Sequence, residues 1–263
     1  MGWSRYKLTS KEISLVAVFA ALYVALSVLP GLPTPGDPTG QIRIEIEASM
    51  APLYGIMLGP YLGALAALIG TLLAWLLPPS PGDIFGLPAL FCPAVDALSV
   101  GLILRGKWKE ASALLATFIA LYWLSPICLP WSSYWYVGLA GSFEKLIALS
   151  LIPPTALAIR RTDLSVESRT SGELAARTGL LYALSFIGNE FDSSLGCTAY
   201  VFFLVGMGFQ VDVVRFYYIC APIVYFLVRV FQALIATAIG GYLLRRPVQG
   251  ALRKAGVEVL MTL

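Results

Sequence analysis

Residues 48–81 read ASMAPLYGIMLGPYLGALAALIGTLLAWLLPPSP and carry no charged side chain between Glu47 and Asp83. As one α-helix this stretch would be ~50 Å long at 1.5 Å per residue, against ~30 Å for the hydrocarbon core of a bilayer. We therefore expect a break at Gly59-Pro60, because proline cannot donate to the preceding turn and glycine permits a reversal. The stretch predicts two membrane helices joined by an almost loopless turn.

Small residues recur every four positions across this turn, at Gly55, Gly59, Gly63 and Ala67. The spacing puts them on one helical face, where helix backbones can approach each other closely inside lipid. Helix packing alone also explains such a row, so it indicates a membrane bundle and not a particular function.

The same turn and the helix before it carry a family resemblance. LGPYLGALAALIG (58–70), preceded by LTSKEISLVAVFAALYVALSVLPG (8–31), resembles the substrate-binding S component of energy-coupling factor (ECF) vitamin transporters. The likeness covers residues 8–104 and is looser beyond. It implies a membrane bundle, usually of six helices with both ends in the cytoplasm, that binds a small vitamin-like molecule near its outer side. It also implies two kinds of partner, a membrane-embedded T subunit and ATPase subunits.

Composition supports a multi-pass protein of the cell membrane. Hydrophobic residues make up 58% of the chain and charged residues 13%, with a mean hydropathy of +0.80; soluble domains average roughly 25% charged residues. The net charge of +3 comes from short basic clusters between apolar runs, which excludes a nucleic-acid partner. No cofactor is expected, and without histidine a histidine-ligated metal site is excluded. The absence of a GxxxxGK[ST] motif means that any ATP coupling comes from other chains.

The apolar runs predict an all-α, single transmembrane domain with six to eight spans, of which eight is preferred. The expected helices are 12–29, 47–58, 60–77, 88–104, 111–128, 136–159, 178–206 and 213–244, with the helix 178–206 interrupted by GNEFDSSLG. Residues 12–159 correspond to the S-component-like helices, 160–177 to a cytoplasmic loop, 178–244 to two further helices, and 245–263 to a cytoplasmic tail. This arrangement puts 14 of the 18 basic residues inside, so both termini are expected in the cytoplasm.

Ionisable side chains within the apolar runs are the candidate substrate-binding residues. Charge inside a bilayer costs ~2.5–3.5 kcal/mol on insertion scales and points to function by default. The candidate binding residues are the ionisable Asp96, Glu144, Lys145, Glu190 and Asp192 and the amide Asn189; Arg229 is a further charged residue within an apolar run. Structural ion pairs are the alternative: Lys145 could neutralise a carboxylate on a neighbouring helix, and Glu190 could pair with Arg229.

Two further groups have a functional and a structural interpretation. Trp131 and Trp135 could stack on a flat ligand at the mouth of a pocket, or belong to the aromatic belt at the membrane surface. Ala17, Ala21 and Ala25 form a strip on the first helix that, in S components, docks on the T subunit; internal packing is the alternative.

Two other functions stay open from sequence. Cys197 in GCTAY, with arginines further on, faintly resembles the exosortase and archaeosortase transpeptidases, but those need a catalytic histidine that this chain lacks. A stand-alone transporter of small molecules is the other alternative. The preferred prediction is a non-enzymatic, substrate-binding subunit of an ECF-type importer.

Overall fold

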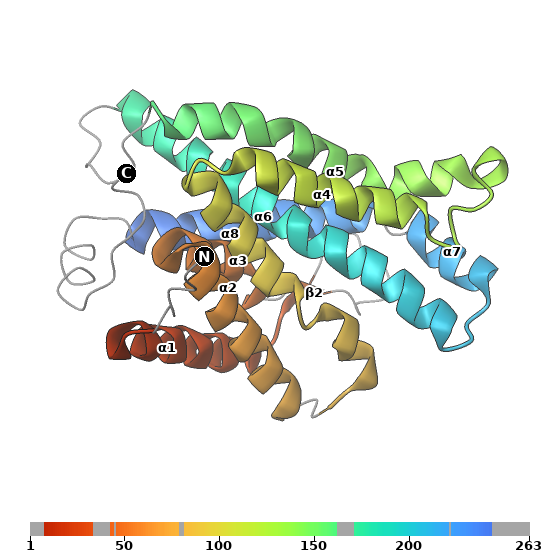
Figure 1. The fold of residues 1–263 in the computed structure, drawn as a ribbon, viewed down its shortest axis with the longest axis horizontal. Coiled ribbons are helices and arrows are strands. Elements are labelled where there is room, and N and C mark those ends of the chain that lie inside the picture. Colours follow the sequence, from red (N-terminus) through yellow and green to blue (C-terminus); the bar gives the residue numbers. More distant parts are fainter. Residues whose placement is uncertain are drawn as a thin grey trace, which may run out of the picture.

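The computed structural model describes residues 8–33, 43–44, 46–78, 82–161, 171–220 and 222–243. Over these ranges the chain is a bundle of eight α-helices, with two 3-10 helices and a pair of two-residue strands (Figure 1). The α-helices are α1 (Ser10–Ser27), α2 (Ala51–Leu76), α3 (Cys92–Leu104), α4 (Trp108–Trp123), α5 (Trp131–Ile159), α6 (Ser171–Gly206), α7 (Val211–Cys220) and α8 (Pro222–Leu243). The remaining elements are η1 (Ala48–Met50), η2 (Ile84–Ala89), β1 (Leu32–Pro33) and β2 (Arg43–Ile44). The predicted all-α membrane bundle is confirmed.

The break predicted at Gly59-Pro60 is present inside α2. Gly59 has φ 82° and ψ 179°, a conformation that L side chains rarely adopt. The two halves then fold against each other, because a Cβ added to Gly63 would lie 2.6 Å from the carbonyl oxygen of Tyr54. In a straight helix these residues would be ~13 Å apart along the axis. The first half is buried throughout and, with η1, is only ~16 Å long, about half of the hydrocarbon thickness.

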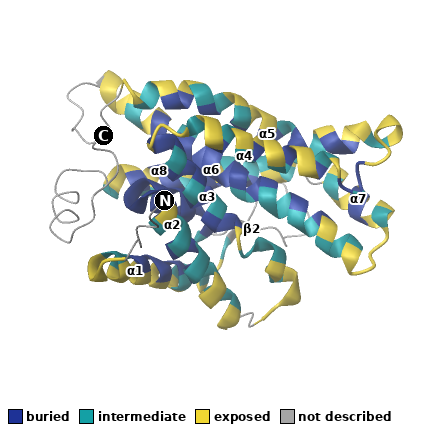
Figure 2. Ribbon diagram, in the orientation of Figure 1, coloured by how far each residue is buried: buried dark blue, intermediate teal, exposed yellow. Residues whose placement is uncertain are grey.

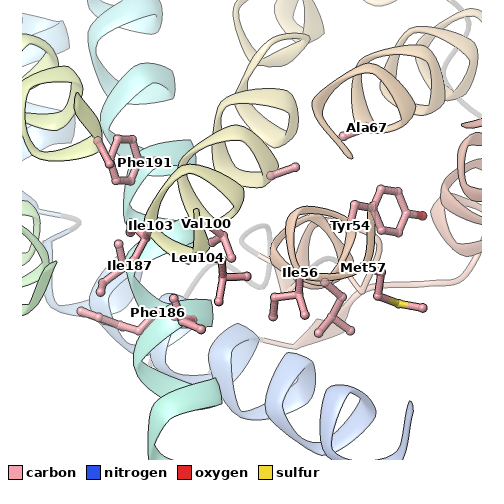
Figure 3. Close-up of a cluster of buried hydrophobic side chains, with 14 of the residues drawn as sticks. Tyr54, Ile56, Met57, Ala67, Val100, Ile103, Leu104, Phe186, Ile187 and Phe191 are labelled. Carbon is pink, nitrogen blue, oxygen red and sulfur yellow. The ribbon is translucent and has the colours of Figure 1, made fainter. Parts of the chain in front are cut away.

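The broken helix α2 lies between α1 and α3. The Tyr54 hydroxyl donates to the carbonyl of Phe19 at 2.8 Å, and the two rings meet edge to face with centroids 5.0 Å apart. Gly55 faces the backbone of Ala97, and Gly101 faces the backbone of Pro60, so small residues set the close approach of α2 and α3. Figure 3 shows the apolar core that α2, α3 and α6 share.

Helix α6 runs through the middle of the bundle and contacts α3, α4, α5 and α8 (Figures 1 and 2). Its residues 180–194 are buried or half-buried. The predicted interruption at GNEFDSSLG is wrong: α6 is helical without a break from Ser171 to Gly206. The backbone can stay helical because an α-helix pairs its own N–H and C=O groups, so polar side chains in this segment do not require a break. Helix α6 also begins inside the segment predicted as a loop.

The region predicted as one helix over residues 213–244 forms two helices. Helix α7 ends at Cys220 and α8 begins at Pro222, with residue 221 outside the described ranges. Proline at the start of α8 fits the rule that it is tolerated in the first turn and disrupts a helix interior. The short α7 packs on α5, α6 and α8 at the end of the bundle where α5 starts.

Five helices of the described chain are long and apolar enough to cross a membrane: α1, η1 with α2, η2 with α3, α5 and α8. Helix α1 begins and α8 ends at the same end of the bundle (Figure 1). The number of spans and the orientation in the membrane stay predictions, as does the cytoplasmic tail, which lies outside the described residues.

Candidate functional site

Six ionisable side chains from four helices lie together inside the bundle. They are Asp96 of α3, Glu144 and Lys145 of α5, Glu190 and Asp192 of α6, and Arg229 of α8, and we call them the charged cluster. Asp96, Glu144, Lys145 and Glu190 are at most 3% exposed. Glu190 lies within electrostatic range of four of the others, and Asp96 within range of Asp192 and Arg229. The structure therefore brings together all five predicted ionisable site residues and Arg229, the further charged residue that the sequence places in an apolar run.

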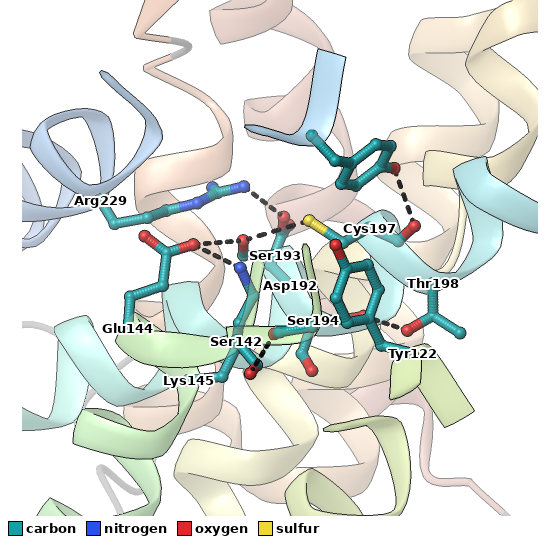
Figure 4. Close-up of polar contacts among 12 residues, drawn as sticks. Tyr122, Ser142, Glu144, Lys145, Asp192, Ser193, Ser194, Cys197, Thr198 and Arg229 are labelled. Atoms are coloured by element: carbon teal, nitrogen blue, oxygen red, sulfur yellow. Dashed lines mark hydrogen bonds and ion pairs between the residues drawn. The ribbon is translucent and has the colours of Figure 1, made fainter. Parts of the chain in front are cut away.

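Two ion pairs organise the cluster (Figure 4). Lys145 pairs with Glu144, its neighbour in sequence, and not with a carboxylate of another helix. Arg229 pairs with Asp192 at 3.3 Å and donates to the Gln232 side chain at 2.7 Å, and so its partner is not Glu190. The Ser193 hydroxyl reaches a Glu144 oxygen at 3.5 Å, which links α6 to α5.

The other polar groups of the cluster have no hydrogen-bond partner among the described residues. Both oxygens of Asp96, both of Glu190, one of Glu144 and both amide atoms of Asn189 are buried and unpaired. An unpaired buried polar group costs roughly 1–3 kcal/mol, and more when it is charged. So many in one place mark a site that a ligand, a proton or water completes.

Asp96 fits into the bundle because α6 has a glycine opposite it. A Cβ on Gly188 would collide with Oδ1 of Asp96 and with a methyl group of Val100. Eight residues further along α6, a Cβ added to Gly196 would lie 3.4 Å from the sulfur of Cys92 in α3. Gly188 and Gly196 thus lie on the face of α6 that packs against α3, and they leave room for the Asp96 carboxyl group.

A narrow hollow lies beside the charged cluster, between α4, α5 and α6. It is lined by Ile119, Tyr122, Gly141, Ser142, Lys145, Ser194 and Cys197. It has no room even for a water molecule, whereas ligand pockets usually measure ~300–1,000 Å³. A ligand can occupy this hollow only when side chains or helices around it move.

Helix α7 covers this hollow. The Tyr218 ring lies 5.8 Å from the ring of Tyr122, and its hydroxyl donates to the Cys197 carbonyl at 2.9 Å. Arg215 holds α7 in place: it is buried, donates to the carbonyl of Ile127 at 2.9 Å, and stacks 3.4 Å from the centre of the Tyr134 ring.

Sequence reasoning did not identify Tyr122, Ser142 or Ser194 as site residues. One signal was available: Ser142 and Lys145, like Ser194 and Cys197, are three positions apart and so share a helix face. Trp131 and Trp135 lie outside the cluster and the lining of the hollow, at the start of α5, and both are half-exposed. The Trp131 indole donates to the carbonyl of Trp123 at 2.8 Å. Their ring-stacking role stays a prediction.

The three alanines of α1 face away from the bundle. Ala17, Ala21 and Ala25 are all exposed, whereas Val16, Phe19, Ala20 and Tyr23 form the buried face. Internal packing therefore does not explain this strip, and its role in binding a partner stays a prediction.

Comparison with known proteins gives a family. A stretch of 85 residues is 29% identical to an uncharacterized protein of Methanocaldococcus jannaschii, and the match covers 32% of this chain and 28% of that protein. No solved structure matches. The profile of a family described as the S component of ECF-type riboflavin transporters matches residues 7–152, which include α1 to α4 and most of α5. The chain belongs to this S-component family.

Proposed function

We propose that this protein captures a small vitamin-like molecule from outside the cell and delivers it together with a T subunit and ATPase subunits. The charged cluster is the observation that carries the proposal. Its unpaired groups are stable only with a partner, and a ligand bound between α3, α5 and α6 can supply one. The hollow and the cluster share helices α5 and α6 and the side chain of Lys145, which supports a single site.

We propose the T subunit and the ATPase subunits as partners on two grounds, the family match and the exposed face of α1. The chain has no nucleotide-binding motif of its own, so the energy of ATP reaches it through other subunits. The exposed alanine strip offers the T subunit a face on which a second helix can pack closely in the bilayer. We place the protein in the cell membrane, with both termini in the cytoplasm.

Ligand binding tests this function. Native mass spectrometry of protein purified from membranes should detect a bound small molecule, and riboflavin is the first compound to titrate because the matched family is named for it. Asp96→Asn, Glu144→Gln and Glu190→Gln should each weaken binding of the identified ligand roughly 5- to 150-fold, the equivalent of ~1–3 kcal/mol. Glu110→Gln is the matched control, since Glu110 is exposed in the first turn of α4.

Two results would contradict the proposal. One is a purified protein that carries no small molecule and binds no water-soluble vitamin. The other is a set of three cluster variants that bind normally and change only in thermal stability, which would make the carboxylates structural.

A further inference from the structure

The fixed charges of the cluster do not balance. It contains four acidic and two basic side chains, and each basic side chain already belongs to an ion pair, Lys145 with Glu144 and Arg229 with Asp192. Asp96 and Glu190 remain, both fully buried and with neither oxygen hydrogen-bonded. The cluster therefore has two carboxyl groups in excess.

The same imbalance holds beside the hollow. Lys145 lines the hollow, and Glu144 and Glu190 both lie within its electrostatic range. These three groups carry one surplus negative charge when the carboxyls are ionised. Glu144 and Glu190 together have three unpaired oxygens, which in the ionised form accept hydrogen bonds and cannot donate them.

A ligand completes this end of the cluster best if it brings both positive charge and N–H donors. A neutral ligand would leave the surplus charge in a medium of low dielectric constant, and an anionic ligand would add to it. The Tyr122 ring in the wall of the hollow suits a cation as well, because the faces of aromatic rings attract positive charge.

We propose that the hollow and the adjoining Glu144–Lys145–Glu190 group form a binding site for a ligand that carries a positively charged, hydrogen-bond-donating nitrogen. The inference rests on the proposed function and specifies the class of molecule captured. The expected ligand therefore differs from riboflavin, whose rings are uncharged at neutral pH. Glu190 belongs to α6, beyond the residues that match the family, whereas Glu144 and Lys145 lie within them.

Cys197 offers a direct test, because it lines the hollow and is half-buried. In protein with the other cysteines, Cys92, Cys128 and Cys220, replaced by alanine, the thiol is reacted with three methanethiosulfonates. One reagent carries a trimethylammonium group, one a sulfonate, and the third is the neutral methyl compound. The ratio of cationic to anionic rates, divided by the same ratio for a small free thiol, reports the local charge independently of the reactivity of the thiol.

We expect this normalised ratio to exceed roughly tenfold, as Coulomb attraction over several ångströms in a partly buried site predicts. Glu190→Gln should lower the ratio several-fold, and Glu110→Gln should leave it unchanged. A Cys197→Ser variant identifies the labelled residue.

Each contrary outcome has a definite meaning. A ratio near one, or one that Glu190→Gln does not lower, overturns the charge preference. No reaction even with the neutral reagent overturns the hollow as a binding site. If riboflavin binds tightly and the ratio is near one, this inference is refuted and the proposed function stands. If the ratio is high but the protein captures no vitamin, the proposed function is refuted and this inference stands.

Discussion

At the scale of single residues, Gly188 determines whether Asp96 fits between α3 and α6. Gly188→Ala would drive a methyl group into the Asp96 carboxyl group and Val100. Overpacking of this kind usually costs about 1–3 kcal/mol, so we expect a lower midpoint of thermal unfolding in detergent. Adding Asp96→Ala should recover much of the loss, because it removes the group that the new methyl meets.

Gly179→Ala is the control for this change. Gly179 lies in the same helix with no atom within 4 Å of an added Cβ, so the substitution should be neutral or stabilise the helix by up to ~1 kcal/mol. Equal effects at the two glycines would show that Asp96 is not seated against Gly188.

The membership of the cluster could be predicted from sequence, but its pairing could not. Charged residues in an apolar run are conspicuous, and this identified Asp96, Glu144 and Glu190. Which carboxylate meets Arg229 depends on a rotation about α6: consecutive helical residues point ~100° apart, so Glu190 and Asp192 face different neighbours. The hydroxyls of Ser142 and Ser194 were missed because serine is common in membrane helices and can bond to its own backbone.

At the scale of elements, the two breaks in the chain differ in how clearly the sequence marks them. Gly59-Pro60 interrupts a run too long for one span, so length and residue type agree there. The break before Pro222 was missed although the run 213–244, at ~48 Å as one helix, is also longer than a single span needs; this length was not weighed together with the proline. Conversely, the polar GNEFDSSLG segment did not break α6, since a helix pairs its own backbone groups whichever side chains it carries.

Helix α7 provides the element-scale prediction. Arg215→Met keeps the length of the side chain but removes its stacking on Tyr134 and its hydrogen bond to Ile127. Losing these contacts costs about 1–3 kcal/mol, so α7 should leave the hollow more often. Cys197 should then react several-fold faster with the neutral methanethiosulfonate, measured by mass spectrometry over time.

Arg105→Met is the matched control for α7. Arg105 also lies over an aromatic ring, Tyr61, at 5.7 Å, but it is exposed and follows α3 directly. An unchanged rate in Arg215→Met, or an equal rise in both variants, would show that Arg215 does not keep the hollow covered.

At the scale of the whole molecule, the site joins two parts of the chain. Asp96, Glu144 and Lys145 lie within the residues that match the family, and Glu190, Asp192 and Arg229 lie beyond them. The sequence could predict a membrane bundle because hydropathy reports burial in lipid. It could not predict that α6 passes through the centre, because the hydropathy of one helix does not say which other helices surround it.

Assembly with a T subunit gives the last prediction. The strip of Ala17, Ala21 and Ala25 is exposed along α1, opposite the buried Phe19 and Tyr23. Ala21→Trp would hold a partner helix away at the point of closest approach while meeting nothing inside the bundle. We expect less T subunit to co-purify with this variant and its unfolding temperature to stay unchanged. Leu234→Trp places the same bulky ring at an exposed position of α8, and this variant should co-purify with as much T subunit as the unaltered protein does. If Ala21→Trp recovers the complex in full, the strip faces lipid, and the T subunit binds another surface.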